Sequence, residues 1–211
     1  MNKIIPLLAI IIFFGCANQS NYEYTIINED IDNAFSKINI DIRLAEEVST
    51  IDLRYIALEL RKSRSSYDKI WIFYFLPGQE PGNGAWAISH FKPELELEIL
   101  GASKEATNKM NLTKVSGNIL SSWYDNDPLL SNRKYLVKEK GKTFIKTIYA
   151  ESKYAGSGGE LVEEVFEKQQ SNGLKRYDYN NTHGEYYLIE KNGNLGLYDD
   201  SGKFKEAIKI D

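Results

Sequence analysis

Residues 37–44 read Lys-Ile-Asn-Ile-Asp-Ile-Arg-Leu and alternate strictly between polar and apolar side chains. A period of two predicts a β-strand with one buried and one solvated face. A helix is predicted to follow, because Ser49 and Asp52 have the spacing of a capping box. Its apolar stripe is expected at Leu53, Ile56, Ala57 and Leu60.

Further strands are predicted on both sides of this pair. A short one, residues 24–27, precedes it. Residues 70–76 are continuously apolar and aromatic, which is typical of a central strand covered on both sides. Residues 85–91 and 94–100 complete the set, with Glu94, Glu96 and Glu98 pointing outward. The order β-β-α-β-β over residues 22–101 predicts a two-layer α+β domain, in which one helix packs on an antiparallel sheet.

Residues 117–211 carry eight strand candidates, separated by turn signals such as Lys140-Gly141 and Asn192-Gly193. The candidates are 118–124, 134–139, 143–149, 160–167, 174–179, 185–190, 194–198 and 203–210. They predict an all-β antiparallel meander, whose closure into a small lipocalin-like barrel would remove its exposed edges. Residues 160–170 also fit a helical period, so a helix remains the alternative there. Residues 102–116 are expected to form a linker.

The composition bounds the function. The chain has 211 residues, of which 27% are charged and 42% hydrophobic, with a formal net charge of -4. These values are typical of soluble globular proteins and disfavour disordered or fibrous classes. A pI near 5.4 argues against a nucleic-acid partner, because phosphate recognition normally requires a basic face. The single cysteine, Cys16, excludes an internal disulfide.

The N-terminus, residues 1–15, has the pattern of a secretory signal. Lys3 supplies positive charge, and residues 4–14 are eleven uncharged residues, interrupted only by Pro6. Such a run is too short to span a bilayer as a helix and has the length of a signal-peptide core. The alternative is a buried helix or strand that carries a free core cysteine.

The run Phe13-Phe14-Gly15-Cys16 resembles the lipobox of bacterial lipoprotein signals. The resemblance implies that a diacylglycerol is attached to the Cys16 thiol and that cleavage makes Cys16 the first residue. Residues 16–21 would then be a polar tether, and acyl chains would anchor the protein at a membrane. The implied location is the cell envelope, on the periplasmic side of the outer membrane if the source has one.

The loop at residues 77–84 is the first candidate site, because Gly78, Gly82 and Gly84 leave backbone N–H groups accessible. It is compatible with an anion-binding nest or a ligand-closing loop, but a long turn between strands is the more ordinary interpretation. Trp86 and His90 follow it. A wider motif, Leu76-Pro77-Gly78, Pro81-Gly82, Gly84-Ala85-Trp86-Ala87, His90-Phe91 and Pro93, resembles one in uncharacterised bacterial lipoproteins, which implies no activity.

Four tyrosines on two neighbouring predicted strands form the second candidate site, a surface for a ligand or partner. They are Tyr177, Tyr179, Tyr186 and Tyr187. The sequence assigns no catalytic residue, metal or cofactor, since it lacks a nucleophile elbow and metal-ligand spacing. Three functions remain: a non-catalytic envelope lipoprotein that binds a ligand or protein, an inhibitor or immunity-type lipoprotein, and a hydrolase with paired carboxylates.

Overall fold

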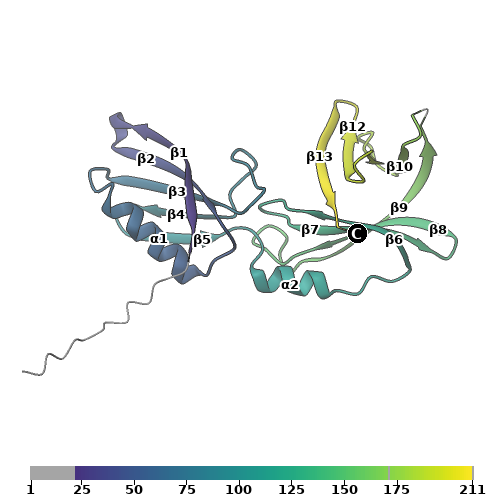
Figure 1. Cartoon of the computed structure of the whole chain (residues 1–211), viewed down its shortest axis with the longest axis horizontal. Coiled ribbons are helices and arrows are strands. Elements are labelled where there is room, and N and C mark those ends of the chain that lie inside the picture. The colour runs from purple at the N-terminus through teal and green to yellow at the C-terminus, as the bar shows by residue number, and fades with distance from the viewer. Residues whose placement is uncertain (1–21, 171, 211) are drawn as a thin grey trace, which may run out of the picture.

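The computed structural model describes residues 22–170 and 172–210, so the signal, Cys16 and tether assignments lie outside the described residues. Two β-sheet units follow one another along the chain and lie side by side (Figure 1). The first unit contains β1 (Tyr24–Asp32), the 3-10 turn η1 (Asn33–Phe35), β2 (Lys37–Leu44), α1 (Thr50–Lys62), β3 (Lys69–Phe75), β4 (Ala87–Phe91) and β5 (Leu95–Ile99).

The predicted start and buried stripe of α1 are confirmed. The Ser49 side chain accepts a hydrogen bond from the Asp52 backbone N–H, and the Asp52 carboxylate accepts one from the Ser49 backbone N–H. The four predicted stripe residues, Leu53, Ile56, Ala57 and Leu60, are buried against the sheet. The β-β-α-β-β order is therefore confirmed, with α1 along one face of the sheet (Figure 1).

The sheet of the first unit is mixed, so the expectation of a purely antiparallel sheet is wrong. In the order β1-β2-β3-β4-β5, strands β2 and β3 run parallel, because α1 crosses between them and returns the chain to the same end. The expectation that β3 is covered on both sides is also wrong. Ile70 and Ile72 face α1 and are fully buried, whereas Trp71 and Phe73 lie on the opposite, partly exposed face.

The second unit is a closed antiparallel barrel with the strand order β10-β11-β12-β13-β6-β7-β8-β9. All eight predicted strands are present: β6 (Asn118–Asp125), β7 (Asn132–Glu139), β8 (Lys142–Tyr149), β9 (Gly159–Gln169), β10 (Lys175–Tyr179), β11 (Tyr186–Ile189), β12 (Leu195–Asp199) and β13 (Gly202–Lys209). The helical alternative for residues 160–170 is wrong, because β9 pairs with β8 on one side and with β10 on the other.

The segment expected to be a linker, residues 102–116, contains α2 (Lys104–Leu112), capped by Ser103. This helix packs on the outside of the barrel, where Met110 lies buried beside Tyr135 and Val137 of β7. The segment therefore belongs to the wall of the second unit. In the described part of the chain, neither α1 nor α2 is long and apolar enough to cross a membrane.

The barrel axis is filled by side chains that alternate inward along the strands. They are Trp123, Leu136, Ile145, Val165, Tyr177, Tyr187, Leu195 and Ala207. The longest loops, residues 126–131, 150–158 and 180–185, gather at one end of the barrel, which we call the barrel mouth. The barrel mouth faces the first unit, because the loop at residues 126–131 contacts that unit directly.

Candidate functional site at the junction of the two units

The two units pack directly on one another. The Asn126 side-chain amide donates to the Pro77 carbonyl oxygen at 2.8 Å, and the Trp86 indole N–H donates to the Ala102 carbonyl oxygen at 2.8 Å. A Cβ atom added at Gly101 would lie 2.1 Å from the Pro128 carbonyl oxygen, so only glycine allows this approach. The barrel mouth is therefore held in a fixed position against the loop at residues 77–84.

A hollow of about 530 Å³ opens at this contact, and we call it the junction hollow. Three segments line it: the loop at residues 77–84, the β6–β7 loop and strand β13. Its lining residues are Gly78, Gln79, Glu80, Asn83, Asp125, Asn126, Asp127, Pro128, Phe204, Lys205, Glu206 and Ile208. Its volume lies in the range of small-molecule sites, which occur preferentially at such interfaces.

Three charged side chains form an ion-paired group within this lining. The Lys205 ammonium lies 3.0 Å from the Asp125 carboxylate and 2.7 Å from the Asp127 carboxylate. Asp127 also accepts hydrogen bonds from the backbone N–H groups of Leu129 and Leu130. The sequence separates these residues by about 80 positions, and only the register of β13 against β6 brings them together.

The pKa shifts of Asp127 and Lys205 keep these two side chains charged near neutral pH. Burial alone would raise the pKa of Asp127, but the hydrogen bonds from Lys205, Leu129 and Leu130 outweigh it and hold that pKa below its usual value. Burial alone would lower the pKa of Lys205, but Asp125 and Asp127 outweigh it and raise that pKa. Asp127 and Lys205 are therefore fixed charges at ordinary pH.

The loop at residues 77–84 is a turn that is tied down from both sides. The Arg43 guanidinium of β2 donates to the Gln79 carbonyl oxygen at 2.7 Å and lies 3.2 Å from the Glu80 carboxylate. Gly78, Gly82 and Gly84 all have positive φ, as a turn of this kind requires. Because four carboxylates and one lysine line the adjoining hollow, the surroundings favour a cation over the anion that a nest would bind.

The structure does not bring Trp86 and His90 together with this loop. Trp86 is buried in the core under α1. His90 lies on the opposite face of the sheet, where its ring stacks on Trp71 with 4.4 Å between centroids. Trp86 therefore fixes the junction through its indole N–H, and His90 belongs to a different surface.

The four tyrosines of the second predicted site do not form one surface either. Tyr177, Tyr179 and Tyr187 lie among the side chains of the barrel interior, whereas Tyr186 lies outside, stacked on Tyr198 with the Arg176 guanidinium over its ring. Side chains of adjacent strand residues point to opposite faces of the sheet, so the Tyr186 and Tyr187 side chains lie on opposite sides of the barrel wall. Burial, with the nearby Glu167 carboxylate, raises the pKa of Tyr177 to about 12.

Sequence reasoning missed a buried cation, Lys134, which is 4% exposed inside the barrel. Its ammonium donates to the Thr147 hydroxyl at 3.4 Å. Burial lowers the pKa of Lys134, although the carboxylates of Asp125 and Glu163 partly oppose that shift. The alternation of side chains along the strand could have indicated this position. Lys134 is two residues from Leu136, so both side chains point inward.

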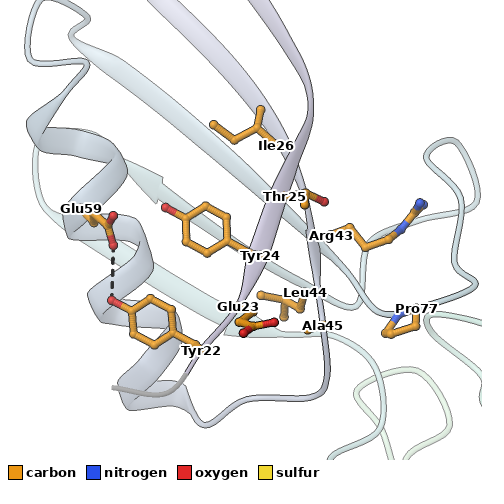
Figure 2. Close-up of a pocket in the computed structure, with 10 residues that line it drawn as sticks. All are labelled: Tyr22, Glu23, Tyr24, Thr25, Ile26, Arg43, Leu44, Ala45, Glu59 and Pro77. Atoms are coloured by element: carbon orange, nitrogen blue, oxygen red, sulfur yellow. Dashed lines mark hydrogen bonds between the residues drawn. The ribbon is translucent and has the colours of Figure 1, made fainter. Parts of the chain in front are cut away.

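A second hollow, of about 950 Å³, lies at the start of β1 (Figure 2). Tyr22 donates to the Glu59 carboxylate at 3.4 Å, and Tyr24 points the same way, toward α1. Arg43 and Pro77 lie on the other side of the β1 strand in this view (Figure 2). The side chains that line this second hollow do not converge on one point. The junction hollow is therefore the better candidate for a ligand site.

No group of three or more His, Cys, Asp or Glu side chains within residues 22–170 and 172–210 is arranged to hold a metal ion. Comparison of the chain with models of protein families, with curated proteins and with solved structures finds no match. No activity is therefore carried over from a relative, and the resemblance to uncharacterised lipoproteins stays a prediction.

Proposed function

We propose that this chain is an exported lipoprotein, anchored in the cell envelope through Cys16, that binds a small molecule in the junction hollow without catalysing a reaction. The observation that carries the proposal is the ion-paired group of Lys205, Asp125 and Asp127. A general acid or base needs a pKa near the working pH. The pKa of Lys205 is raised and the pKa of Asp127 is lowered, so both move further from neutral pH. This suits recognition of a ligand by fixed charges.

The chemistry of the hollow suggests the class of ligand. Its carboxylates outnumber its single lysine, while Phe204 and Ile208 offer exposed apolar contact. A small molecule with a positively charged group and an apolar part would complement both. Lipocalin-like barrels hold a ligand along the axis. Here Trp123, Tyr177 and Tyr187 occupy the axis, so the proposed ligand sits at the barrel mouth.

Replacing Asp127 with asparagine tests this site. We expect the amine ligand to bind about tenfold more weakly, since a hydrogen bond to a charged group contributes about 1.5 kcal/mol. A thermal-shift titration with choline, spermidine and arginine measures the effect, because a ligand of the folded state raises Tm. The matched control is Asp199→Asn, since Asp199 also accepts a backbone N–H in a turn at the mouth. If the ligands raise the Tm of Asp127→Asn and of the original protein equally, the junction hollow is not the binding site.

Replacing Cys16 with serine tests the anchor. We expect acyl labelling to disappear and the protein to leave the membrane fraction, because serine offers no thiol for the diacylglycerol. Labelling with a radioactive fatty acid, with and without globomycin, measures the outcome. Labelling that persists in the serine variant would show that Cys16 is not the lipidated residue.

An inhibitor or immunity-type lipoprotein is the second candidate. It would need a protein-docking surface away from the junction hollow. The outward glutamates of β5 favour it, because Glu96 and Glu98 are both exposed and offer charge to a partner.

A further inference from the structure

Within residues 22–170 and 172–210, no helix or second sheet covers one face of the five-stranded sheet. Helix α1 packs on the other face, over the even-numbered residues of β2 and β3. The uncovered face carries Asn39, Asp41, Trp71, Phe73, Ile88 and His90, each partly exposed. We call this surface the aromatic face.

The register of the sheet lines up the side chains of the aromatic face in rows across the strands. One row runs through Asn39, Trp71, His90 and Glu96, which are successive partners on β2 to β5. The His90 ring lies 4.4 Å from the Trp71 ring at an interplanar angle of 14°, and His90 Nε2 lies 3.2 Å from the Glu96 carboxylate. Phe73 stacks on Trp71 with 6.4 Å between centroids. The centre of the face is therefore a preformed aromatic cluster.

Acidic side chains flank this cluster on both sides. Asp30 of β1 and Asp41 of β2 lie on one side, and Glu96 and Glu98 of β5 lie on the other. The Glu96 side chain is 72% exposed. A hollow of about 400 Å³ lies where the aromatic and acidic parts meet, lined by Ile88, His90, Glu96, Leu97 and Glu98. Across the strands, the surface thus offers an apolar centre between acidic side chains on both sides, while Lys37 and Lys69 lie on the same face at the start of β2 and β3.

We propose that the aromatic face docks a partner protein through a basic segment, in which lysine or arginine side chains flank an apolar one. The apolar side chain contacts the aromatic cluster, and the cations pair with the flanking carboxylates. Charge complementarity of this kind steers association and fixes the register of the partner. The site is separate from the junction hollow and does not depend on it.

The stacking geometry favours a protein over a carbohydrate. A sugar usually packs flat on an exposed aromatic ring, but the Trp71 ring is already stacked by His90 and Phe73. The carboxylates beside it also favour cations over neutral hydroxyl groups. We therefore place a basic protein segment here and treat a carbohydrate as an outcome of the test.

The three tryptophans provide a direct readout by NMR. The indole N–H groups of Trp86 and Trp123 donate to the backbone carbonyl oxygens of Ala102 and Gly193, at 2.8 Å each. Trp71 is partly exposed on the aromatic face. Titration of the labelled protein with a synthetic Arg-Leu-Arg-Leu-Arg peptide should shift the Trp71 indole signal and leave the other two in place. The shift should weaken as salt rises, because salt screens exposed charges.

The acidic side chains of β5 are tested by the double variant Glu96→Gln and Glu98→Gln, which leaves the sheet core untouched because both side chains are exposed. We expect it to bind the peptide about fivefold more weakly. The matched control is Glu160→Gln with Glu164→Gln on the barrel strand β9, which should bind as the original protein does. Three results would overturn the proposal: an unmoved Trp71 signal, equal binding by the Glu96/Glu98 variant, or a Trp71 shift caused by a chitin oligosaccharide in place of the peptide.

Discussion

Replacing Trp123 with alanine is expected to lower the free energy of unfolding of the barrel by about 3–5 kcal/mol. Trp123 is fully buried in the barrel interior, and its indole N–H donates to the Gly193 carbonyl oxygen at 2.8 Å. It also stands at the closing seam, where β13 pairs with β6 through Ile208 with Tyr124 and Lys209 with Trp123. Its removal therefore creates a large cavity and loosens the contact that closes the ring.

Urea unfolding followed by far-UV circular dichroism measures the effect of Trp123→Ala. The matched control is Leu112→Ala, because the Leu112 side chain is 81% exposed and its truncation should change stability by less than about 0.5 kcal/mol. Trp123→Phe separates the two contributions, since it keeps most of the packing and removes the hydrogen bond to Gly193. An alanine variant as stable as the control would contradict the described interior.

Replacing Lys134 with methionine is expected to stabilise the protein by about 1–3 kcal/mol at neutral pH, the usual cost of burying a polar group without full compensation. Lys134 is buried among barrel side chains, and burial lowers its pKa because the charged form loses hydration. Methionine has a similar volume and no charge, so the variant avoids that cost. The substitution also removes the attraction between Lys134 and the carboxylates of Asp125 and Glu163. This loss reduces the expected gain in the free energy of unfolding.

The same substitution has a predicted pH dependence. Between the lowered folded-state pKa of Lys134 and the unfolded value of 10.5, the unfolded chain binds more protons than the folded one. The stability contributed by this group therefore rises with pH across that window. The advantage of Lys134→Met should be largest below the folded pKa and shrink toward pH 10.5. Unfolding free energies of both proteins at pH 7, 8 and 9 measure the difference, and an advantage that grows with pH would contradict a buried ammonium.

Local periodicity was enough to predict most secondary structure. The strand at residues 37–44, the capping box of α1 and the eight barrel strands all follow from side-chain alternation, caps and turn residues. The parallel pairing of β2 and β3 did not follow, because strand direction depends on where the crossover helix delivers the chain. The partly exposed face of β3 was missed for a related reason: a continuous apolar run does not reveal that only one side is covered.

The candidate site was less predictable than the fold. The loop at residues 77–84 was singled out for its glycines, and it does line the junction hollow. The group of Asp125, Asp127 and Lys205 could not be predicted from the sequence. Lys205 is far from the two aspartates along the chain and reaches them only through strand pairing. The four tyrosines were grouped by proximity in sequence, yet alternation sends Tyr186 outward and Tyr187 inward.

The sequence by itself predicted helix α1 and the positions of the strands, and it predicts the lipid anchor at Cys16, since both depend on short-range pattern. Helix α2 was not predicted, because residues 102–116 were expected to form a linker. The tertiary structure alone decided that the barrel closes, that its mouth meets the glycine loop, and that Lys205 bridges Asp125 and Asp127. The physical reason is that register, closure and burial of charge depend on the packing of distant segments. A local pattern can indicate which face of a strand is apolar, but only packing decides what covers it.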